Sequence, residues 1–312
     1  MPAQRECEIN DEARHLKKGD GVLCERNPVK YAWITEHRSI FPIKMMCRLL
    51  GVSRHGECNK DHDLFRHIEE IFEESYRTYG TRRIKKALDN TCGWIVSRRR
   101  IARAMKKLGL RAKTKRRLRI TTTHSRHTLS ISPNLLDQNF DASAPNEVYA
   151  GDITYIKTKE GWLYLAVVID LYARAVVGWA IADHMQTSLI SDALIKADRK
   201  RGSFAPDAIF HSDRGSQYAS QEYRTLLHTF KMRQSMSGKG NGYDNAVSES
   251  FFGTMKTELL YPTKFQTKKE AINTITHYIG FYNTKRLHSY NGYLSPLEME
   301  LKWWQAYFRK SA

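Results

Sequence analysis

Three acidic residues occupy positions from which a folded chain could bring them together. Asp152 lies inside the apolar run VYAGDITYI, Asp213 follows another short apolar run, and Glu249 stands in a segment of helical periodicity. Residues 214–248, 35 in number, separate the last two acids. A carboxylate in a buried strand is costly unless it is paired or binds a metal, and a two-metal phosphoryl-transfer site needs several such oxygen ligands. The pattern therefore predicts a metal-dependent site for phosphoryl transfer.

The carboxylates also indicate which metal the site would take. Hard oxygen ligands suit Mg²⁺ or Mn²⁺. Two such ions about 3.5–4 Å apart can activate the attacking oxygen and stabilise the leaving one, so we expect Asp152, Asp213 and Glu249 to bind two ions, with Asp152 bridging them. Lys256 follows Glu249 by seven residues, two helical turns along the same face. This places Lys256 to contact a phosphate or a terminal base.

Two other groups of possible ligands are interpreted differently. Asp170, in VVIDLYAR, also ends a strand-like run, but Arg174 lies four residues on and could pair with it, so we assign Asp170 a structural role. A second group holds four potential zinc ligands: His55, Cys58, His62 and His67. It lacks a second cysteine at ligand spacing, which argues against zinc. No Ser-His-Asp arrangement, Walker loop or dinucleotide-binding signature is visible.

Positive charge is concentrated in one part of the chain. The 312 residues carry a net charge of +18, and residues 82–126 hold 17 lysines and arginines against a single acid, Asp89. A solubilising basic face is one explanation. The density favours a nucleic-acid-binding surface instead, because neutralising phosphates supplies most non-specific affinity for nucleic acid.

Composition also indicates the cellular compartment in which the protein is found. No apolar run approaches the roughly 18 residues of a transmembrane helix, and the polar N-terminus is unlike a signal peptide. The five cysteines are scattered with no CxxC pair, which favours reduced thiols in a cytosol. We therefore expect a cytoplasmic protein.

Helical patterns dominate the first part of the chain. Residues 41–52 predict a short amphipathic helix, as part of a helix-turn-helix or as an ordinary helix with a glycine stop. Further helices are predicted over residues 62–76, after Thr81 and after Ser97. The last of them carries a basic face: Arg99, Arg103, Lys106 and Lys107. Three short helices with a basic last one favour a helix-turn-helix-like DNA-binding unit over a helical spacer.

The following part combines strand and helix patterns. Strands are predicted where Val, Ile, Tyr and Trp are frequent between turn residues, at residues 148–157, 162–172, 175–182, 208–210 and 232–236. Helices are predicted where apolar residues recur at helical spacing, at residues 187–199, 220–230 and 245–260. This βββαβαβα order is that of an α/β ribonuclease-H-like fold, a mixed five-stranded sheet with flanking helices, here preceded by the all-helical region.

The tail follows as a further helical extension. Residues 268–282 predict an amphipathic helix, and residues 283–312 contain an apolar cluster: Trp303, Trp304, Tyr307 and Phe308. We expect this cluster to pack on the core, with an exposed partner-binding patch as the alternative.

These patterns predict six segments. They are a disordered leader at 1–28, a short helical segment at 29–60, the basic helix-turn-helix-like domain at 61–120, a linker at 121–145, the catalytic core at 146–262 and the helical extension at 263–312.

Longer stretches of the chain resemble a known family. The motifs are GDITYI, VVIDLYARAVVGW, HSDRGSQY, GNGYDNAVSESFFGTMKTE and FYNTKRLHSYNGYLSP. They resemble the second-frame (OrfB) transposases of the IS-three family of bacterial insertion sequences, over roughly residues 29–300. Asp152, Asp213 and Glu249 are similar to the DDE triad of those transposases and of retroviral integrases.

The resemblance implies a reaction. Mg²⁺-dependent cleavage would free the 3′ ends of the element, and the 3′-OH would attack another strand without a covalent protein intermediate. In this family the attack first joins the two ends of the element into a circle. The three acids would bind metal and Lys256 would contact the transposon end. A family motif after the catalytic helix matches Tyr282, Asn283, Arg286 and His288, which we assign to DNA contact or fold support.

The resemblance also implies partners. Such proteins act on transposon-end and target DNA, and are often made as a fusion with a first-frame (OrfA) protein that carries the main end-binding helices and a leucine zipper. No heptad run is visible in this chain. We therefore expect weak, unspecific DNA binding by this chain alone, and a homo-oligomer in the synaptic complex.

The sequence departs from the family pattern in three places. Tyr149 stands where Trp is frequent, the segment after Arg54 lacks the usual aromatic residues, and residues 1–28 precede the usual start. Two other functions therefore stay open, a ribonuclease-H-like nuclease without strand transfer and a non-catalytic DNA-binding regulator.

Overall fold

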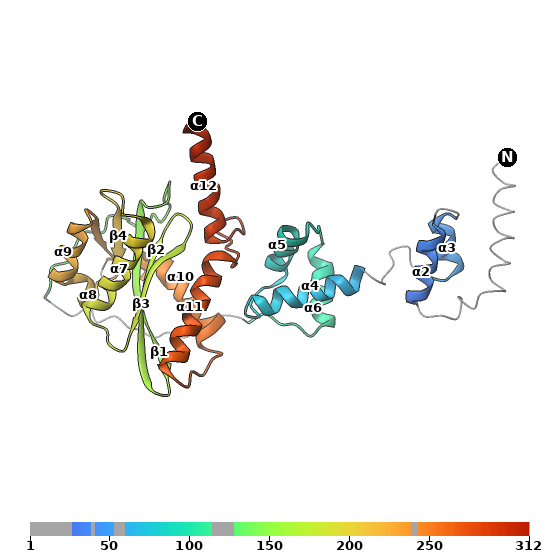
Figure 1. Cartoon of the computed structure of the whole chain (residues 1–312), viewed down its shortest axis with the longest axis horizontal. Helices are drawn as coiled ribbons and strands as arrows, with labels where there is room; N and C mark the ends of the chain where they lie inside the picture. The colour runs from blue at the N-terminus through green and yellow to red at the C-terminus, as the bar shows by residue number, and fades with distance from the viewer. Residues whose placement is uncertain (1–26, 39–40, 53–59, 114–127, 239–241, 312) are drawn as a thin grey trace. The chain divides into compact units, whose positions relative to one another are not determined.

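The computed structural model describes residues 27–38, 41–52, 60–113, 128–238 and 242–311 (Figure 1). The chain divides into two compact units, one comprising Met1–Glu74 and Leu88–Leu110, the other Ser75–Ala87 and Arg111–Ala312. The described residues leave out nearly all of the expected leader, two of the zinc candidates (His55 and Cys58) and residues 121–127 of the predicted linker.

The first unit begins with two short helices, α2 (Asn27–His37) and α3 (Ile43–Leu49). They pack through a small cluster formed by Ile34, Met46, Cys47 and Leu50. The predicted helix is thus confirmed. Ile43, the first residue of α3, lies outside this cluster and is 48% exposed.

Three more helices follow, α4 (Lys60–Glu74), α5 (Thr81–Cys92) and α6 (Arg98–Lys107). The helix α6 begins as predicted at Ser97, whose hydroxyl accepts a hydrogen bond from the backbone N–H of Arg100 at 3.3 Å. Its buried residues are Ile101, Ala104 and Met105, and it packs against α4. The helix α5 is shared between the units, since its residues through Ala87 belong to the second and those from Leu88 to the first.

The second unit is built on a five-stranded mixed sheet. Its strands are β1 (Val148–Thr158), β2 (Gly161–Asp170), β3 (Ala175–Ala182), β4 (Ile209–Ser212) and β5 (Arg233–Met236). The spatial order is β3-β2-β1-β4-β5. Strands β1, β2 and β3 form an antiparallel meander, whereas β4 and β5 run parallel to β1. The predicted ribonuclease-H-like sheet is confirmed.

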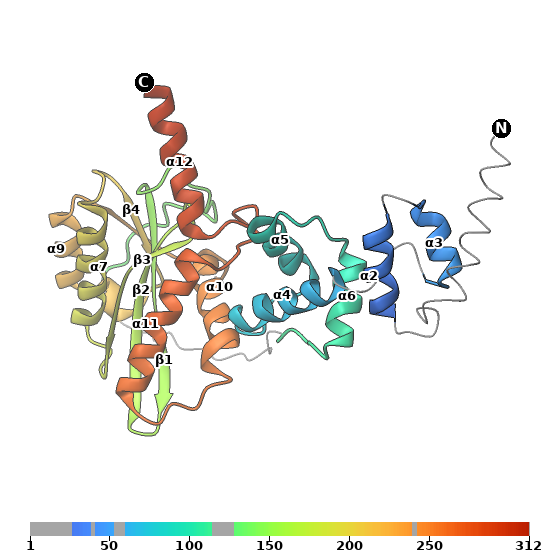
Figure 2. The ribbon, with the colours of Figure 1, turned by 45° about the vertical axis from the view of Figure 1, so that its right-hand side comes forward.

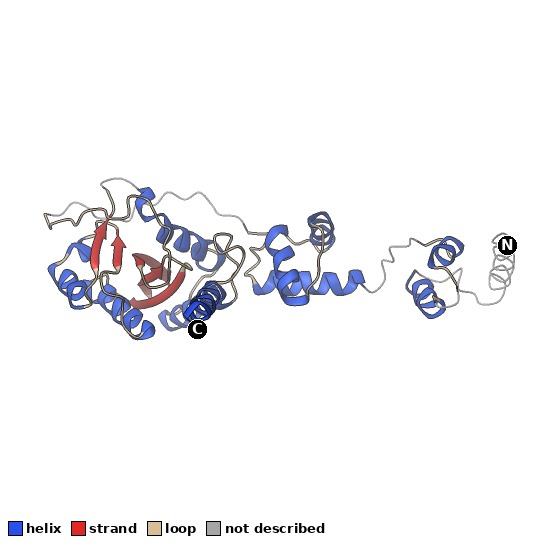
Figure 3. Ribbon diagram, turned by 90° about the horizontal axis from the view of Figure 1, so that it is seen from above, coloured by secondary structure: helices blue, strands red, loops and turns tan. Residues whose placement is uncertain are grey.

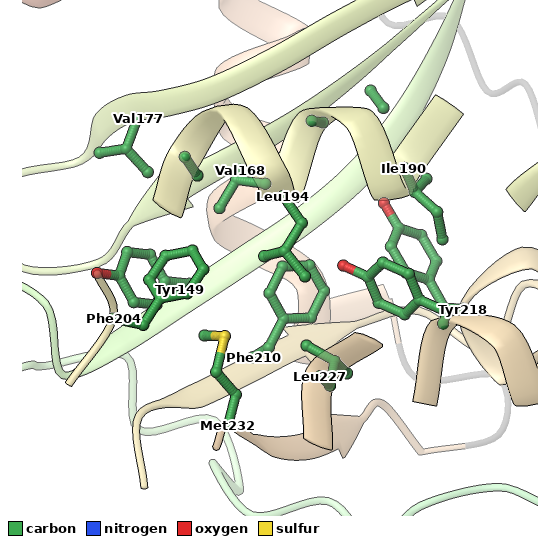
Figure 4. Packing of buried hydrophobic residues seen from close by; sticks show 14 of the residues in the cluster. Tyr149, Val168, Val177, Ile190, Leu194, Phe204, Phe210, Tyr218, Leu227 and Met232 are labelled. Carbon is green, nitrogen blue, oxygen red and sulfur yellow. The ribbon is translucent and has the colours of Figure 1, made fainter. Parts of the chain in front are cut away.

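Helices cover both faces of this sheet (Figure 3). On one face lie α7 (Thr187–Arg201), α8 (Ser216–Ala219) and α9 (Gln221–Thr229). Figure 4 shows the packing there, with Tyr149 and Phe210 from the sheet against Leu194 from α7. On the other face lie α10 (Ala246–Met255), the π-helical segment η3 (Lys256–Leu260) and α11 (Lys268–Thr284). A buried core on each face fixes the strands that carry the acidic residues.

Two predictions about the second unit need correction. The helix expected over 245–260 begins at Ala246, after a 3-10 turn (Gly242–Asn245), and it changes without a break from the α-helix α10 to the π-helical η3. The last helix, α12 (Pro296–Ser311), packs on the core only in part: the Trp303 ring lies 6.4 Å from that of Tyr172, but Tyr307 and Phe308 are 50% and 62% exposed. Figures 1 and 2 show the C-terminal half of α12 extending past the sheet.

Asp170 has the structural role expected of it, with a different partner. Its carboxylate pairs with Arg201 at 2.9 Å and accepts the backbone N–H groups of Asn146 and Tyr172. The expected partner Arg174 instead donates to the Phe140 carbonyl and stacks on a tyrosine ring. Among the described helices, none combines the length and apolar character needed to cross a bilayer.

Candidate active site

The strand β1 carries Asp152 in the middle of the sheet, between β2 and β4. Its carboxylate accepts the backbone N–H of Ile153 at 2.7 Å. The strand is formed by β-branched and aromatic residues that fill both faces. The polar side chain is therefore held within a largely apolar element, as the sequence predicted.

The parallel pairing of β1 and β4 brings the second acid alongside. Ala150 is registered with His211, and the same register continued by two residues sets Asp152 beside Asp213. Neighbouring strands lie about 4.8 Å apart, and residues two apart point to the same face. Asp213 follows the last residue of β4 and accepts the backbone N–H of Gly215 at 2.9 Å. That bond orients its carboxylate at the end of the strand.

The third acid comes from the helix α10, which packs against β1. Glu249 lies in its first turn, and Lys256 begins η3 immediately after it. The Lys256 ammonium lies 5.6 Å from the centre of the Tyr155 ring on β1. Phe251, Phe252 and Met255 anchor α10 in the core, so the helix can present Glu249 and Lys256 toward β1.

Four charged residues lie close enough to influence one another's ionisation: Asp152, Asp213, Glu249 and Lys256. Burial raises the pKa of Asp152 to about 8, and the negative charges of Asp213 and Glu249 add to this rise, whereas Lys256 opposes it. Partial desolvation also raises the pKa of Glu249. Like charges disfavour each other's ionised form at short range. The three acids predicted from the sequence are therefore close enough to influence one another, and a positive charge among them is favoured.

The donor set fits a hard divalent cation. Asp152 is near enough to Asp213 and Glu249 to be influenced by their charges, and the side-chain oxygen of Asn245, one turn before Glu249, is buried without a hydrogen-bond partner among the described residues. Oxygen ligands of this kind suit Mg²⁺ or Mn²⁺. Within the described ranges, no three histidine, cysteine, aspartate or glutamate side chains, the three acids included, are grouped closely enough to hold a metal ion. The acids are therefore near enough to influence one another's charge without forming a preassembled metal site.

The predicted basic face is present on α6 of the first unit. Its four residues are all exposed: Arg99, Arg103, Lys106 and Lys107. The ammonium of Lys107 lies 5.6 Å from the Phe65 ring. Because the apolar residues of this helix point inward, its outer face offers concentrated positive charge to a polyanion.

Of two residues expected to contact DNA or support the fold, Arg286 is buried and His288 is half-buried. Arg286 is 4% exposed, and its guanidinium binds the carboxylate of Glu258 at 2.8 Å. The His288 ring packs edge-on against Tyr282 at 4.7 Å. Burial, together with the nearby charge of Arg286, lowers the pKa of His288 to about 3. These placements favour fold support over DNA contact.

One residue near the site was missed by sequence reasoning. Asp244 is 2% exposed and accepts hydrogen bonds from the backbone of Gly238 at 2.6 Å and from the amides of Asn134 and Gln138. It therefore anchors the segment that leads into α10. No role was expected of Asp244 within the motif GNGYDNAVSESFFGTMKTE, and residues 239–241, just before it, lie outside the described chain. The sequence feature that could have drawn attention to Asp244 is its position five residues before Glu249.

Comparison with known proteins identifies three matching family models. A model of the integrase core domain matches residues 142–242, and a second integrase core model matches residues 230–296. A model of an HTH-like domain matches residues 59–117. The first two span the sheet and the helices that carry the acidic cluster, and the third spans the basic helices.

Individual relatives cover almost the full chain. The transposase InsF for insertion sequence IS3A of Escherichia coli is 40% identical over 290 residues, covering 88% of this chain and 99% of the relative. The 31 kDa protein of insertion element IS600 from Shigella sonnei is 43% identical over 272 residues, covering 83% and 99%. Among solved structures, the HTLV-2 integrase catalytic core domain in complex with magnesium (dimeric form) is 18% identical, with a TM-score of 0.40 over 51% of this chain and 98% of that chain.

Proposed function

The chain belongs to the insertion-sequence transposases related to InsF of IS3, and from this premise we propose that Asp152, Asp213 and Glu249 are its catalytic residues. The observation that supports the proposal is the parallel register of β1 and β4, which pairs Ala150 with His211 and, continued by two residues, would bring Asp152 beside Asp213. The influence of Glu249 on the pKa of Asp152 adds the third acid.

The three carboxylates would hold one or two divalent cations, Mg²⁺ or Mn²⁺. Once bound, the cations would activate the attacking oxygen and stabilise the leaving oxygen of an in-line displacement at phosphorus. Asp152 interacts electrostatically with both other acids, so it is the one placed to be shared between two ions. With its pKa raised to about 8, Asp152 would be largely protonated at neutral pH, and a bound cation would favour its ionised form.

The chain's own residues would position the DNA. Lys256, held between α10 and β1 near the acids, would bind a phosphate of the transposon end beside the scissile bond. Water would first cut the phosphodiester bond at a 3′ end of the element, which frees a 3′-OH and leaves the phosphate on the flanking strand. The freed hydroxyl would then attack a phosphodiester bond of another strand and displace the 3′ oxygen of that bond. The first such attack would join one end of the element to the other, and a later one would join the element to the target. No side chain need bond covalently to the DNA.

The basic helices would supply non-specific affinity. We assign residues 61–120 to DNA binding through Arg99, Arg103, Lys106 and Lys107, residues 146–262 to catalysis and residues 263–312 to a helical extension. The first-frame (OrfA) protein of the same element would provide end-specific binding. Bringing two ends together requires at least a dimer of active sites, and the reaction would take place in the bacterial cytoplasm on the chromosome.

One assay tests this function. Purified protein is incubated with a labelled terminal oligonucleotide and Mg²⁺, with and without the first-frame protein. Cut and joined products are expected, and both should disappear on chelation of the metal. Glu249→Gln should abolish both products and leave DNA binding intact, while Asp192→Asn, which removes an exposed carboxylate on α7, should change neither. Cutting without joining would indicate a nuclease, and bound but unchanged DNA a regulator.

A further inference from the structure

The helix that carries Glu249 has an unusual end. The α-helix α10 continues directly into η3, where the backbone N–H of Tyr261 donates to the carbonyl of Lys256, five residues earlier, at 2.8 Å. Short π-helical segments inside helices are rare and frequently lie at functional sites. Because η3 begins at Lys256, the contacts that hold η3 also determine where this lysine points.

The contact that holds η3 is a buried ion pair. Glu258 is 4% exposed, and its carboxylate accepts hydrogen bonds from Nη2 of Arg286 at 2.8 Å and from Nε at 3.0 Å. The hydroxyls of Tyr278 and Thr78 donate to the same carboxylate at 2.7 and 3.2 Å. A buried charge is tolerated when it is paired and fully hydrogen-bonded. These four contacts leave Glu258 a single orientation.

The geometry of a helix relates this pair to the acidic cluster. Glu258 follows Glu249 by nine residues. The first six of these steps lie in the α-helix α10, and the last three lie in the wider π-helical η3, so the two glutamates lie on different sides of the helix. One side therefore carries Glu249 toward Asp152, while another carries Glu258 into the protein.

A second contact ties the same arginine to α10. The Arg286 guanidinium lies 5.7 Å from the centre of the Tyr282 ring, and Tyr282 packs perpendicular to Phe251 at 4.8 Å. Phe251 is two residues after Glu249. Arg286 thus contacts η3 directly and α10 through one aromatic ring, which restricts both the rotation and the slide of the helix.

We propose that the Glu258–Arg286 ion pair positions Glu249 and Lys256 for the transposase reaction, an inference that rests on the proposed function. Glu258 and Arg286 would not themselves contact the reacting atoms. The ion pair fixes the rotation of α10 and η3 about their axis. Glu249 is thereby held close enough to Asp152 to influence its pKa, and the Lys256 ammonium is held over the Tyr155 ring. Residues that orient metal ligands typically change metal affinity or activity by roughly 10–100-fold when they are replaced.

The test compares three variants with the wild type. Glu258→Gln keeps the size of the side chain and removes its charge. The double variant Glu258→Leu with Arg286→Met replaces the pair by apolar groups, a change that is often neutral or stabilising for a buried ion pair. The control Glu300→Gln breaks another largely buried pair of the same unit, Glu300 with Arg201 at 2.6 Å, on α12 and α7.

Two readouts are taken for each variant. Mn²⁺ affinity is measured on the protein without DNA, and cutting of the labelled end is measured with Mg²⁺. For Glu258→Gln and for the double variant, we expect Mn²⁺ affinity and the cutting rate each to fall roughly 10–100-fold. The double variant is expected to unfold near the wild-type temperature. The control is expected to keep wild-type affinity and rate, whatever its stability.

Each outcome decides the inference. If the double variant binds Mn²⁺ and cuts like the wild type, or if Glu300→Gln loses as much as Glu258→Gln, the pair is merely structural. If the wild type binds Mn²⁺ but cuts nothing, the proposed function fails. The positioning role of the ion pair is then decided by the Mn²⁺ affinities of the variants relative to the wild type. If the wild type binds no Mn²⁺, there is no site to position and both proposals are overturned.

Discussion

The ammonium group of Lys256 lies 5.6 Å from the centre of the Tyr155 ring, so the first residue of η3 rests on the strand that carries Asp152. Burial lowers the pKa of Lys256, and the nearby charge of Asp152 opposes this decrease. The lysine therefore forms a positive charge at the edge of a cluster of three acids. A phosphate entering this site would meet Lys256 directly.

Replacing Lys256 by Gln is expected to weaken binding of end DNA by a similar factor for all sequences, because a phosphate contact carries no base information. The slope of log affinity against log salt should fall by about one, as for the loss of one phosphate contact. Titrations at several salt concentrations measure both. Lys269→Gln, which removes an exposed charge at the start of α11, is the control. An unchanged slope for Lys256→Gln would exclude the contact.

The basic face of α6 gives a second prediction. Replacing Arg99, Arg103, Lys106 and Lys107 together by Gln should reduce the salt slope by up to about four, since each neutralised phosphate contributes roughly 0.9 to it. All four side chains are exposed, so the unfolding free energy should change little. DNA titrations and thermal unfolding of the same preparation separate the two effects. Equal DNA affinity for the variant and the wild type would place the DNA surface elsewhere.

The acidic cluster was predictable because its signals are local. An acid within a run of strand-forming residues and an acid directly after another such run are visible in the sequence, and the order of strands and helices predicts that the two strands are neighbours. The register then follows from the fold, and it sets Asp152 beside Asp213. The helical spacing of Glu249 and Lys256 is equally local.

Other features of the fold depend on contacts between residues far apart in the sequence, which local patterns do not predict. Glu258 looks like an ordinary surface charge on a helix, and only the fold brings Arg286, 28 residues later, into contact with it. Apolar residues at helical spacing predict a buried face, but they do not say whether the chain supplies a surface to cover it. Tyr307 and Phe308 stack on Trp303 and Trp304 of the same helix, yet they remain 50% and 62% exposed.

The exposure of Phe308 predicts a mild phenotype. Phe308→Ser should change the unfolding free energy by no more than about 0.5 kcal/mol, as for most surface substitutions, because the side chain is 62% exposed. Denaturant unfolding measures this. A loss of 2 kcal/mol or more, in the range for truncating a core side chain, would show that the ring is buried in solution.

The close approach of α7 to β3 predicts a much larger effect at Gly178. A methyl group added there would collide with the carbonyl oxygen of Ala193 and would lie 2.6 Å from the Cβ of Ala197. Since the obstacle is partly backbone, Gly178→Ala should destabilise the protein by about 1–3 kcal/mol, as overpacking does. Gly280→Ala is the matched control. Gly280 is exposed within α11 with open space around it, so alanine should stabilise the helix by up to about 1 kcal/mol.

The last prediction concerns acid sensitivity and starts from His288. Burial, with the positive charges of Arg286, Arg83 and Arg174, lowers its pKa from the ordinary 6.5 to about 3 in the folded protein. The unfolded chain therefore binds a proton near pH 6.5, whereas the folded protein does not until about pH 3. The contribution of this group to stability is complete above pH 6.5 and is lost as the pH falls below that value.

At pH 5 the loss amounts to about 2 kcal/mol, since each pKa unit corresponds to about 1.4 kcal/mol. His288→Asn cannot take up the proton, so its unfolding free energy should fall by about 2 kcal/mol less than that of the wild type between pH 7 and pH 5. Denaturant unfolding at both pH values measures this difference, and any loss of packing in the variant cancels because it is present at both. Parallel pH dependences for the two proteins would mean that His288 is free to ionise in the folded state, and that the positive charge of Arg286 is not felt at the imidazole.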